Sequence, residues 1–158
     1  MKKSVFVFSS SFISSSADET KKIGERFGVI IKSTPPLTRA RVITLRGDLG
    51  TGKTTFTKGA AKGFDVKKRI TSPTFVLIKR FPIQSKYYKN FIHIDAYRLS
   101  SFHDLEQLEI HSFLNDPSFI IFIEWPERVS SKIVKSCGSV TLKHKTNETR
   151  LITIKLSQ

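Results

Sequence analysis

The feature that most constrains this chain is a glycine-rich segment that begins at Gly47 and ends at Thr54. It reads Gly-Asp-Leu-Gly-Thr-Gly-Lys-Thr and fits the pattern G-x-x-x-x-G-K-[ST], whose glycines allow the backbone to wrap closely around a phosphate group. A strand-like run at 41–46 precedes the segment, and a helix-like run at 55–64 follows it. Because this motif requires a strand before it and a helix after it, the sequence predicts a nucleotide-binding loop in an α/β domain.

The side chains of the loop predict how a nucleotide would be held. Lys53 is expected to offer a solvent-facing ammonium group to the β- and γ-phosphates, and the Thr54 hydroxyl is expected to ligate Mg²⁺. Successive backbone N–H groups and the positive end of the following helix would add to the attraction for phosphate. The predicted nucleotide-binding residues of this segment are Asp48, Leu49, Gly50, Thr51, Gly52, Lys53, Thr54 and Thr55.

Two further apolar runs, at 91–95 and 119–124, each end in an acidic residue, Asp95 and Glu124. In an open α/β sheet the carboxyl ends of the strands form the edge where ligands bind, so both carboxylates are expected near the glycine-rich loop. A phosphoryl-transfer site needs a carboxylate close to Mg²⁺ and a group that positions the attacking water. Lys53, Asp95 and Glu124 are therefore the candidate catalytic residues, and Thr54 and Glu124 the candidate metal ligands. The alternative for either acid alone is a simple cap on a strand end.

Length and composition fit one domain that spans residues 1–158. A chain of this size with 39% hydrophobic residues can bury one α/β core, and a second full domain does not fit. Cys137 is the single cysteine, so no internal disulfide can form, and a reducing cytoplasm is the expected setting. The apolar run at 5–8 is interpreted as a first strand and not as a signal peptide, because serines at 9–11 interrupt it. No stretch reaches the length of a membrane helix.

The net charge of +14 favours polyanionic partners. The excess is concentrated at 58–89, where Asp65 is the only acidic residue. Nine basic residues lie in that stretch: Lys58, Lys62, Lys67, Lys68, Arg69, Lys79, Arg80, Lys86 and Lys89. A surface that contacts nucleic acid and a merely solvated basic surface account equally well for this pattern. No RNA-recognition motif with interleaved aromatic residues is present.

The remaining elements alternate along the chain. Ser16 and Glu19 form a capping box ahead of a helix with apolar residues at helical spacing, which the prolines in 32–37 end. Further strands are predicted near 74–81, 91–95 and 119–124, a helix at 102–114, and a β-hairpin from 139–145 and 150–156. The predicted fold is a mostly parallel central sheet flanked by helices, with a C-terminal β-hairpin.

Four motifs in order give the chain a family resemblance. They read GDLGTGKTTF at 47–56, SPTF at 72–75, HIDAYRL at 93–99 and EWPE at 124–127. This combination resembles the bacterial TsaE family, also called YjeE, over about residues 16–128. These are small ATPases of tRNA threonylcarbamoyladenosine synthesis.

The resemblance implies a role for individual residues. Lys53 and Thr54 would bind the phosphates and Mg²⁺, Glu124 would be the second Mg²⁺ ligand, and Asp95 would support hydrolysis. The segment 72–74 would sense the γ-phosphate, and the neighbourhood of Glu124 would lie beside the nucleotide. Thr74, Trp125 and Glu127 therefore join the predicted nucleotide-binding residues.

The chain also departs from the family pattern. An aromatic residue or leucine usually stands in the family at the place of Ile94 or Ala96, and a glycine at the place of Glu109. Packing after Asp95 is therefore expected to differ. Trp125 alone would more often be a packed core residue than a ligand contact.

Family membership would imply partners and a reaction. TsaE proteins act with TsaB and with TsaD, which carries the transferase site for the adenine beside the anticodon of tRNA. ATP hydrolysis by this chain would reset that complex, and it is expected to be weak without partners. The competing interpretations are a free-standing small-molecule or nucleoside kinase, and an RNA-binding module with a vestigial nucleotide site. A kinase lid needs several arginines, and only Arg98 and Arg128 lie near the predicted site in the sequence. The intact Lys53, Thr54, Asp95 and Glu124 argue against the vestigial site.

Overall fold

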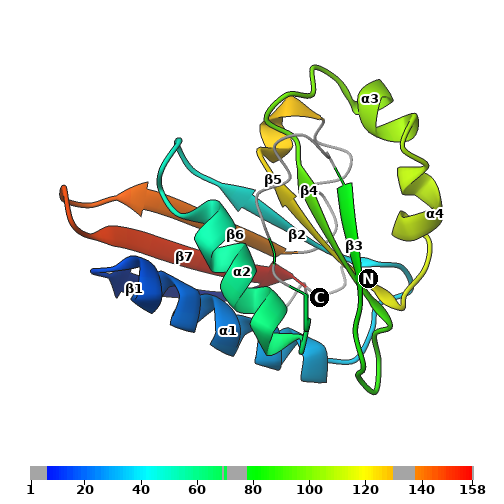
Figure 1. Cartoon of the computed structure of the whole chain (residues 1–158), viewed down its shortest axis with the longest axis horizontal. Helices are drawn as coiled ribbons and strands as arrows, with labels where there is room; N and C mark the ends of the chain where they lie inside the picture. Colours follow the sequence, from blue (N-terminus) through cyan, green and yellow to red (C-terminus); the bar gives the residue numbers. More distant parts are fainter. Residues whose placement is uncertain (1–6, 69, 71–77, 130–137, 158) are drawn as a thin grey trace, which may run out of the picture.

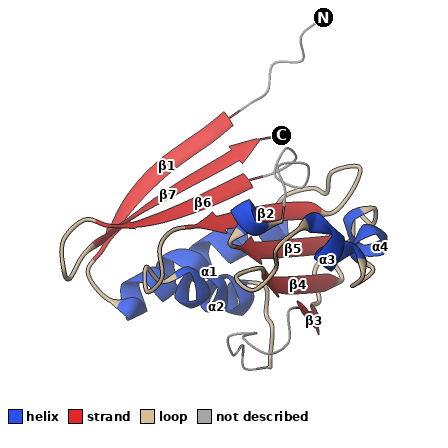
Figure 2. Ribbon diagram, turned by 90° about the horizontal axis from the view of Figure 1, so that it is seen from above, coloured by secondary structure: helices blue, strands red, loops and turns tan. Residues whose placement is uncertain are grey.

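A computed structural model describes residues 7–68, 70, 78–129 and 138–157. One sheet runs through the molecule in the strand order β1-β7-β6-β2-β5-β4-β3, with two longer helices on one face and two short ones on the other (Figures 1 and 2). The strands are β1 (Val7–Ser14), β2 (Arg41–Arg46), β3 (Ile78–Pro82), β4 (Asn90–Asp95), β5 (Phe119–Glu124), β6 (Gly138–His144) and β7 (Arg150–Ser157). The helices are α1 (Ala17–Ser33), α2 (Lys53–Gly63), α3 (Phe102–Glu106), α4 (Ile110–Leu114) and the 3₁₀ turn η1 (Pro126–Arg128).

The sheet is mixed, which corrects the prediction of a mostly parallel sheet. The four inner strands β6, β2, β5 and β4 are parallel, whereas β1, β7 and β3 each pair antiparallel with a neighbour. The predicted hairpin of β6 and β7 is confirmed, and its short turn at 145–149 allows only antiparallel pairing. The hairpin and β1 thus extend a parallel core with antiparallel strands.

The strand β5 lies at the centre of the core and is buried on both faces. Phe122 packs with Phe27 of α1 and Phe64, just after α2, on one face. Ile121 belongs to a second apolar cluster on the opposite face, together with Leu105 of α3. This two-sided burial explains why β5 is a continuous apolar run and not an alternating one.

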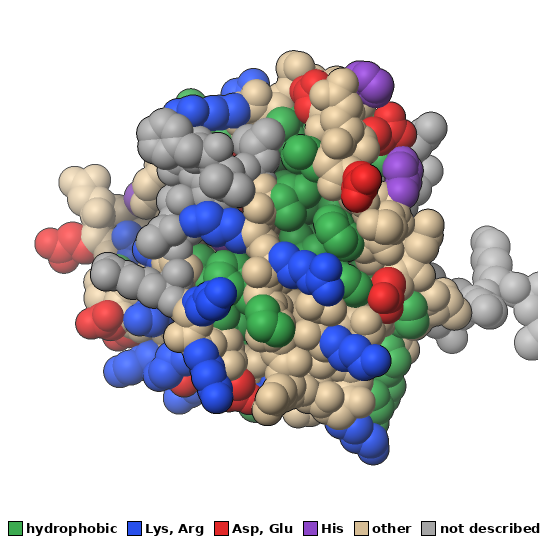
Figure 3. All heavy atoms as spheres, turned by 45° about the vertical axis from the view of Figure 1, so that its right-hand side comes forward, with side chains coloured by type: hydrophobic (Ala, Val, Ile, Leu, Met, Phe, Trp, Pro, Cys, Tyr) green, Lys and Arg blue, Asp and Glu red, His purple; other side chains and the backbone are tan. Residues whose placement is uncertain are grey.

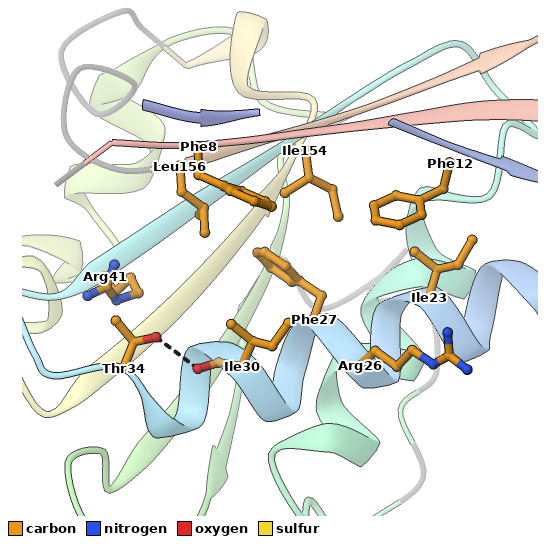
Figure 4. A pocket seen from close by; sticks show the side chains of 10 residues that line it. All are labelled: Phe8, Phe12, Ile23, Arg26, Phe27, Ile30, Thr34, Arg41, Ile154 and Leu156. Carbon is orange, nitrogen blue, oxygen red and sulfur yellow. Dashed lines mark hydrogen bonds between the residues drawn. The ribbon is translucent and has the colours of Figure 1, made fainter. Parts of the chain in front are cut away.

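The predicted first strand is present as β1, and it includes the serines at 9–11. The described part runs from Val7 to Ser14 and pairs in register with β7, so that Ser11 lies opposite Thr153. The two hydroxyls are hydrogen-bonded at 3.1 Å. Serine is tolerated here because β1 is an edge strand whose outer face is exposed. Figure 4 shows the other face, where Phe8 and side chains of α1 and β7 line an apolar groove of about 400 Å³.

The prediction of one helix at 102–114 is wrong, because two short helices stand in its place. The break falls at Glu109, whose φ of 56° is in the left-handed region that a continuous helix cannot contain. Glycine adopts this conformation without steric cost, so the glycine that the resemblance leads us to expect at this position would suit the same backbone. The predicted helix at 55–64 begins two residues earlier, at Lys53. The predicted strand near 74–81 lies partly outside the described residues, and β3 covers its end.

The helices α1 and α2 are in contact through glycines. A Cβ atom on Gly24 or Gly28 of α1 would lie 2.3 Å and 2.2 Å from backbone oxygens of α2. On α2, a Cβ on Gly59 would lie 2.0 Å from the carbonyl oxygen of Lys21, and one on Gly63 would lie 2.3 Å from that of Glu25. The two backbones therefore approach as closely as only glycine allows, which fixes the position of α2 under the glycine-rich loop. In the described part of the chain, no helix is both long enough and apolar enough to cross a membrane.

Substituting Gly59→Ala is expected to destabilise the fold by about 1–3 kcal/mol, although alanine is the better helix former. The added methyl group would push against the backbone of α1, which cannot move without disturbing the core. Urea denaturation should show the loss against the control Lys58→Ala, an exposed neighbour on the same helix. A Gly59→Ala variant at least as stable as the wild type would contradict this account of the helix contact.

Candidate functional site

The glycine-rich loop joins the end of β2 to the start of α2, and three of its glycines have positive φ, namely Gly47, Gly50 and Gly52. At Gly47 a Cβ would also lie 2.3 Å from the carbonyl oxygen of Leu142 on β6. The loop is closed internally by Thr51, whose hydroxyl donates to the carbonyl of Asp48 at 2.8 Å. The glycines predicted to allow a wrapped loop therefore do so, and one of them is also required by the neighbouring strand.

Gly52, the residue that precedes helix α2, has a left-handed conformation with φ 100°. No described side chain caps this end of the helix. The N–H groups of the first turn, which have no partners inside a helix, therefore remain available to an anion. The helix dipole adds about half a positive charge at the same place.

Lys53 lies differently from the expectation. Its side chain is not solvent-facing but buried, at 5% exposed. The ammonium donates to the carbonyls of Gly47 at 2.6 Å and Asp48 at 2.9 Å, and it lies 3.8 Å from the centre of the Trp125 ring. Burial lowers the pKa of Lys53, while the surrounding carboxylates oppose this shift. The first of these is Glu124, followed by Glu127, Asp95 and Asp48.

Glu124 is the most constrained charge of the site. Its side chain is 2% exposed and comes from the end of β5. One carboxylate oxygen accepts from the Thr54 hydroxyl at 3.0 Å. The other accepts from His93 Nε2 at 2.8 Å and from the Thr57 hydroxyl at 3.5 Å. A buried carboxylate needs such donors, and these come from α2 and β4, so the charge joins three elements.

The contact between Thr54 and Glu124 brings together the two predicted metal ligands. Both offer oxygen atoms, which are the ligands that Mg²⁺ prefers. Among the described residues, no cluster of three or more His, Cys, Asp or Glu side chains forms a metal cage. Mg²⁺ in nucleotide sites usually takes only one or two protein ligands and fills the rest with phosphate oxygens and water. The pair of oxygens therefore fits Mg²⁺ bound together with a nucleotide.

Asp95 ends β4 beside Glu124, because the two residues are register partners in the parallel pair β4–β5. One carboxylate oxygen accepts the backbone N–H of Tyr97 at 3.0 Å. Burial raises the pKa of Asp95, the Tyr97 N–H opposes this shift, and the charge of Glu124 adds to it. The predicted convergence of the two acids at one sheet edge is therefore present in the structure.

Trp125 follows β5 in a left-handed conformation, with φ 58°. This is uncommon for a bulky residue and costs free energy. Its backbone N–H donates to Leu45 of β2 at 3.2 Å, and its ring lies 5.0 Å from that of Tyr97. The ring is partly exposed beside Lys53, so Trp125 is a residue of the site edge and not of the interior.

The other predicted residues that the structure describes lie around this centre. Leu49 is 76% exposed at the tip of the loop, and Glu127 forms an ion pair with Arg46 at 3.6 Å. Thr55 lies in the first turn of α2. Thr74 and the rest of the predicted γ-phosphate sensor at 72–74 lie outside the described residues, as does Cys137.

His93 belongs to the site but was not among the predicted residues. It is fully buried, and its Nδ1 has no hydrogen-bond partner among the described residues. The signal was present in the sequence, since His93 lies two positions before Asp95 on one strand and therefore shares its face. A buried histidine on the same face as the candidate catalytic acid Asp95 needs a hydrogen-bond partner, and Glu124 is that partner.

The basic stretch contributes to one concave surface near the end of α2. Five lysines surround a hollow of about 390 Å³: Lys21, Lys58, Lys62, Lys67 and Lys68. Lys62 is paired with Glu25 at 2.9 Å. Several separate Lys and Arg side chains also lie on the lower half of the face in Figure 3. Contact with RNA stays a prediction, and Arg69 lies outside the described residues.

Comparisons with known proteins agree with these features. The family profile described as "Threonylcarbamoyl adenosine biosynthesis protein TsaE" matches residues 14–152. The protein named "tRNA threonylcarbamoyladenosine biosynthesis protein TsaE" of Treponema pallidum is 31% identical over 142 residues, which cover 90% of this chain and 97% of that protein. The protein of the same name from Haemophilus influenzae is 35% identical over 107 residues, which cover 68% of this chain and 65% of that protein. The crystal structure of Bacillus subtilis YdiB superposes with a TM-score of 0.66 at 25% identity and covers 97% of this chain and 88% of that one.

The bond between His93 and Glu124 can be tested with two variants of similar size. His93→Leu removes the donor and leaves a buried carboxylate oxygen short of a hydrogen bond, which should cost about 1–3 kcal/mol of unfolding free energy. His93→Gln retains an N–H donor and should lose clearly less. Because Nδ1 of the wild-type histidine has no partner among the described residues, its removal costs neither variant a hydrogen bond, and the difference between the variants in urea denaturation reports on the Nε2 bond. Equal stability of the two variants would show that the bond does not hold Glu124.

Proposed function

This chain belongs to the TsaE family, and from that membership and the geometry of its site we propose that it is a Mg²⁺-dependent ATPase subunit of tRNA threonylcarbamoyladenosine synthesis. In this proposal the whole chain, residues 1–158, is one ATPase domain of the P-loop type. Its activity serves a transferase complex of the TsaB and TsaD type, which modifies the adenine beside the anticodon.

The observation that carries the proposal is the convergence of three groups at one end of the sheet. The glycine-rich loop and the uncapped start of α2 offer N–H groups to phosphate. Lys53 adds a cation, and Thr54 and Glu124 add a pair of oxygens for a metal. Each group alone occurs in many proteins, but together they match the needs of a bound nucleoside triphosphate with Mg²⁺.

The position of Lys53 supports phosphate binding in a specific way. Its ammonium is held over the loop by two backbone carbonyls, which accept hydrogen bonds but carry no formal charge. A phosphate oxygen carries negative charge and forms the stronger, charge-assisted bond. Lys53 can therefore exchange one carbonyl for a phosphate oxygen at little cost, and its burial strengthens the attraction.

The two acids would divide the chemistry. Glu124, fixed by three donors, would hold Mg²⁺ with Thr54, and the bound Mg²⁺ would neutralise phosphate charge. Asp95 is less enclosed and its pKa is raised, so it is the better group to orient or accept a proton from the attacking water. The other predicted contacts, Asp48 to Gly52, Thr55, Thr74, Trp125 and Glu127, would complete the nucleotide site.

A free-standing kinase is the second candidate, and the arginines described near the site do not favour it. Such an enzyme closes arginines over the phosphates. Arg128 instead stacks on Tyr97, with 5.6 Å between its guanidinium carbon and the ring centre, and Arg46 is engaged with Glu127. The two functions differ in product, so phosphate release and phosphate transfer distinguish them.

We expect phosphate release from ATP to be slow for the chain alone and faster when TsaB and TsaD are added. Lys53→Ala should abolish the stimulated rate and weaken ATP binding by about tenfold to a hundredfold, because its lost charge-assisted bonds are worth about 1.5–3 kcal/mol each. Calorimetry and a phosphate-release assay would measure both, with Lys143→Ala on β6 as the exposed-lysine control. Transfer of phosphate to an added nucleoside would favour the kinase, and wild-type ATP affinity of Lys53→Ala would refute the assigned role.

Substituting the two acids should separate metal binding from turnover. Glu124→Gln should weaken binding of Mg²⁺-ATP by about tenfold or more while sparing ATP without metal, since a hard cation prefers a carboxylate to an amide. Asp95→Asn should retain most of the binding and lose turnover. Calorimetry with and without Mg²⁺, followed by single-turnover assays, measures both effects against Glu25→Gln on α1. Reversed phenotypes would exchange the roles of the two acids.

A further inference from the structure

The groove of Figure 4 lies between helix α1 and the end of the sheet formed by β7 and β1. Its volume is about 400 Å³, which falls in the range of about 300–1,000 Å³ that small-molecule sites have. Apolar side chains of three elements line it: Phe8 and Phe12 of β1, Ile154 and Leu156 of β7, and Phe27 and Ile30 of α1. Because Phe8, Phe12 and Ile30 are exposed, the folded chain leaves apolar surface uncovered along this groove.

The groove is long and narrow, because it follows one face of α1. The lining residues of this helix recur at helical spacing, from Ile23 to the helix cap Thr34. At about 1.5 Å per residue, this stretch of the helix is about 16 Å long. The hydrocarbon core of a bilayer is about 30 Å thick, so one lipid acyl chain spans about 15 Å. The groove therefore has the length and the apolar lining that an extended acyl chain needs.

A buried positive charge, Arg41 at the start of β2, lies at one end of the groove (Figure 4). Its side chain is 3% exposed. Nε donates to the Tyr88 hydroxyl at 2.9 Å, and Nη2 donates to the Pro35 carbonyl at 2.8 Å. Both acceptors are neutral, no ion pair joins Arg41 to another described residue, and no acidic side chain is among the residues that line the groove. A guanidinium cannot lose its proton, so within the described part of the chain this buried charge lacks a counter-ion.

We propose that this groove binds an aliphatic carboxylate, with its acyl chain along α1 and its carboxylate on Arg41. A small hydrophilic anion would leave the exposed phenylalanines uncovered, and an uncharged hydrocarbon would leave Arg41 without a counter-ion. Only a molecule with an apolar body and an anionic head satisfies both ends, and a carboxylate forms a strong, charge-assisted bond with a guanidinium. Arg26, at the opposite end of the groove, is exposed and already solvated. The inference is independent of the function proposed for the glycine-rich loop.

The test is titration calorimetry of the full chain with octanoate, decanoate and dodecanoate, each below the concentration at which it forms micelles. Affinity should rise about fourfold for each CH₂ group that enters the groove. Decanol, which has the same chain without the charge, should bind about tenfold to a hundredfold more weakly than decanoate, because it lacks the charge-assisted bond to Arg41. On apolar surface alone the alcohol would bind at least as well as the carboxylate, so this comparison tests the role of Arg41 without any variant.

Two neighbours on α1 provide a matched pair of variants. Ile30→Ser should weaken decanoate binding by about fourfold or more, because Ile30 lines the groove. Val29→Ser should leave it unchanged, since Val29 is also exposed but does not line the groove. Arg41→Met should remove the preference for decanoate over decanol; if this variant does not fold, the wild-type comparison still decides. No decanoate binding, equal binding of decanoate and decanol by the wild type, or equal effects of the two serine variants would each overturn the inference.

Discussion

The site depends on one buried charge, the carboxylate of Glu124. A carboxylate that is 2% exposed persists only with donors on both oxygens, and those donors come from Thr54, Thr57 and His93. The interaction therefore ties the start of α2 and the middle of β4 to the end of β5. The parallel register then places Asp95 next to Glu124 without any contact of its own being required. The position of α2, the contact between the two candidate metal ligands and the position of Asp95 are all linked to the hydrogen bonds that this carboxylate accepts.

A second constraint acts from the other side of α2. Glycines on both helices let the backbones of α1 and α2 touch, so that α2 is held between a helix and a sheet. The loop before α2 is thus fixed at its end by backbone packing and at its start by the contact of Gly47 with β6. Such rigidity suits phosphate binding, because N–H groups that are already oriented need no reorganisation when an anion arrives.

The sequence predicted what depends on local pattern. The glycine-rich loop, the acid-ended strands β4 and β5, the capped start of α1 and the hairpin of β6 and β7 each have a short-range signal, and all are present. The mixed sheet and the left-handed Glu109 were missed, because strand direction depends on distant pairing and the helical spacing at 102–114 continues through the break. The buried position of Lys53 was missed because the loop supplies its own acceptors for the ammonium. The assignments of nucleotide and metal contacts stay predictions.

His93 shows why sequence reasoning stops short at the candidate site. Its side chain is fully buried, its Nε2 is hydrogen-bonded to Glu124, and its Nδ1 has no partner among the described residues. A sequence selected for stability alone would replace such groups with apolar ones of similar size, which are often as stable or more so. The cost of burying His93 is offset in part by the hydrogen bond between its Nε2 and the buried Glu124 carboxylate. That bond joins residues 31 positions apart on two strands, so no local pattern in the sequence could have predicted it.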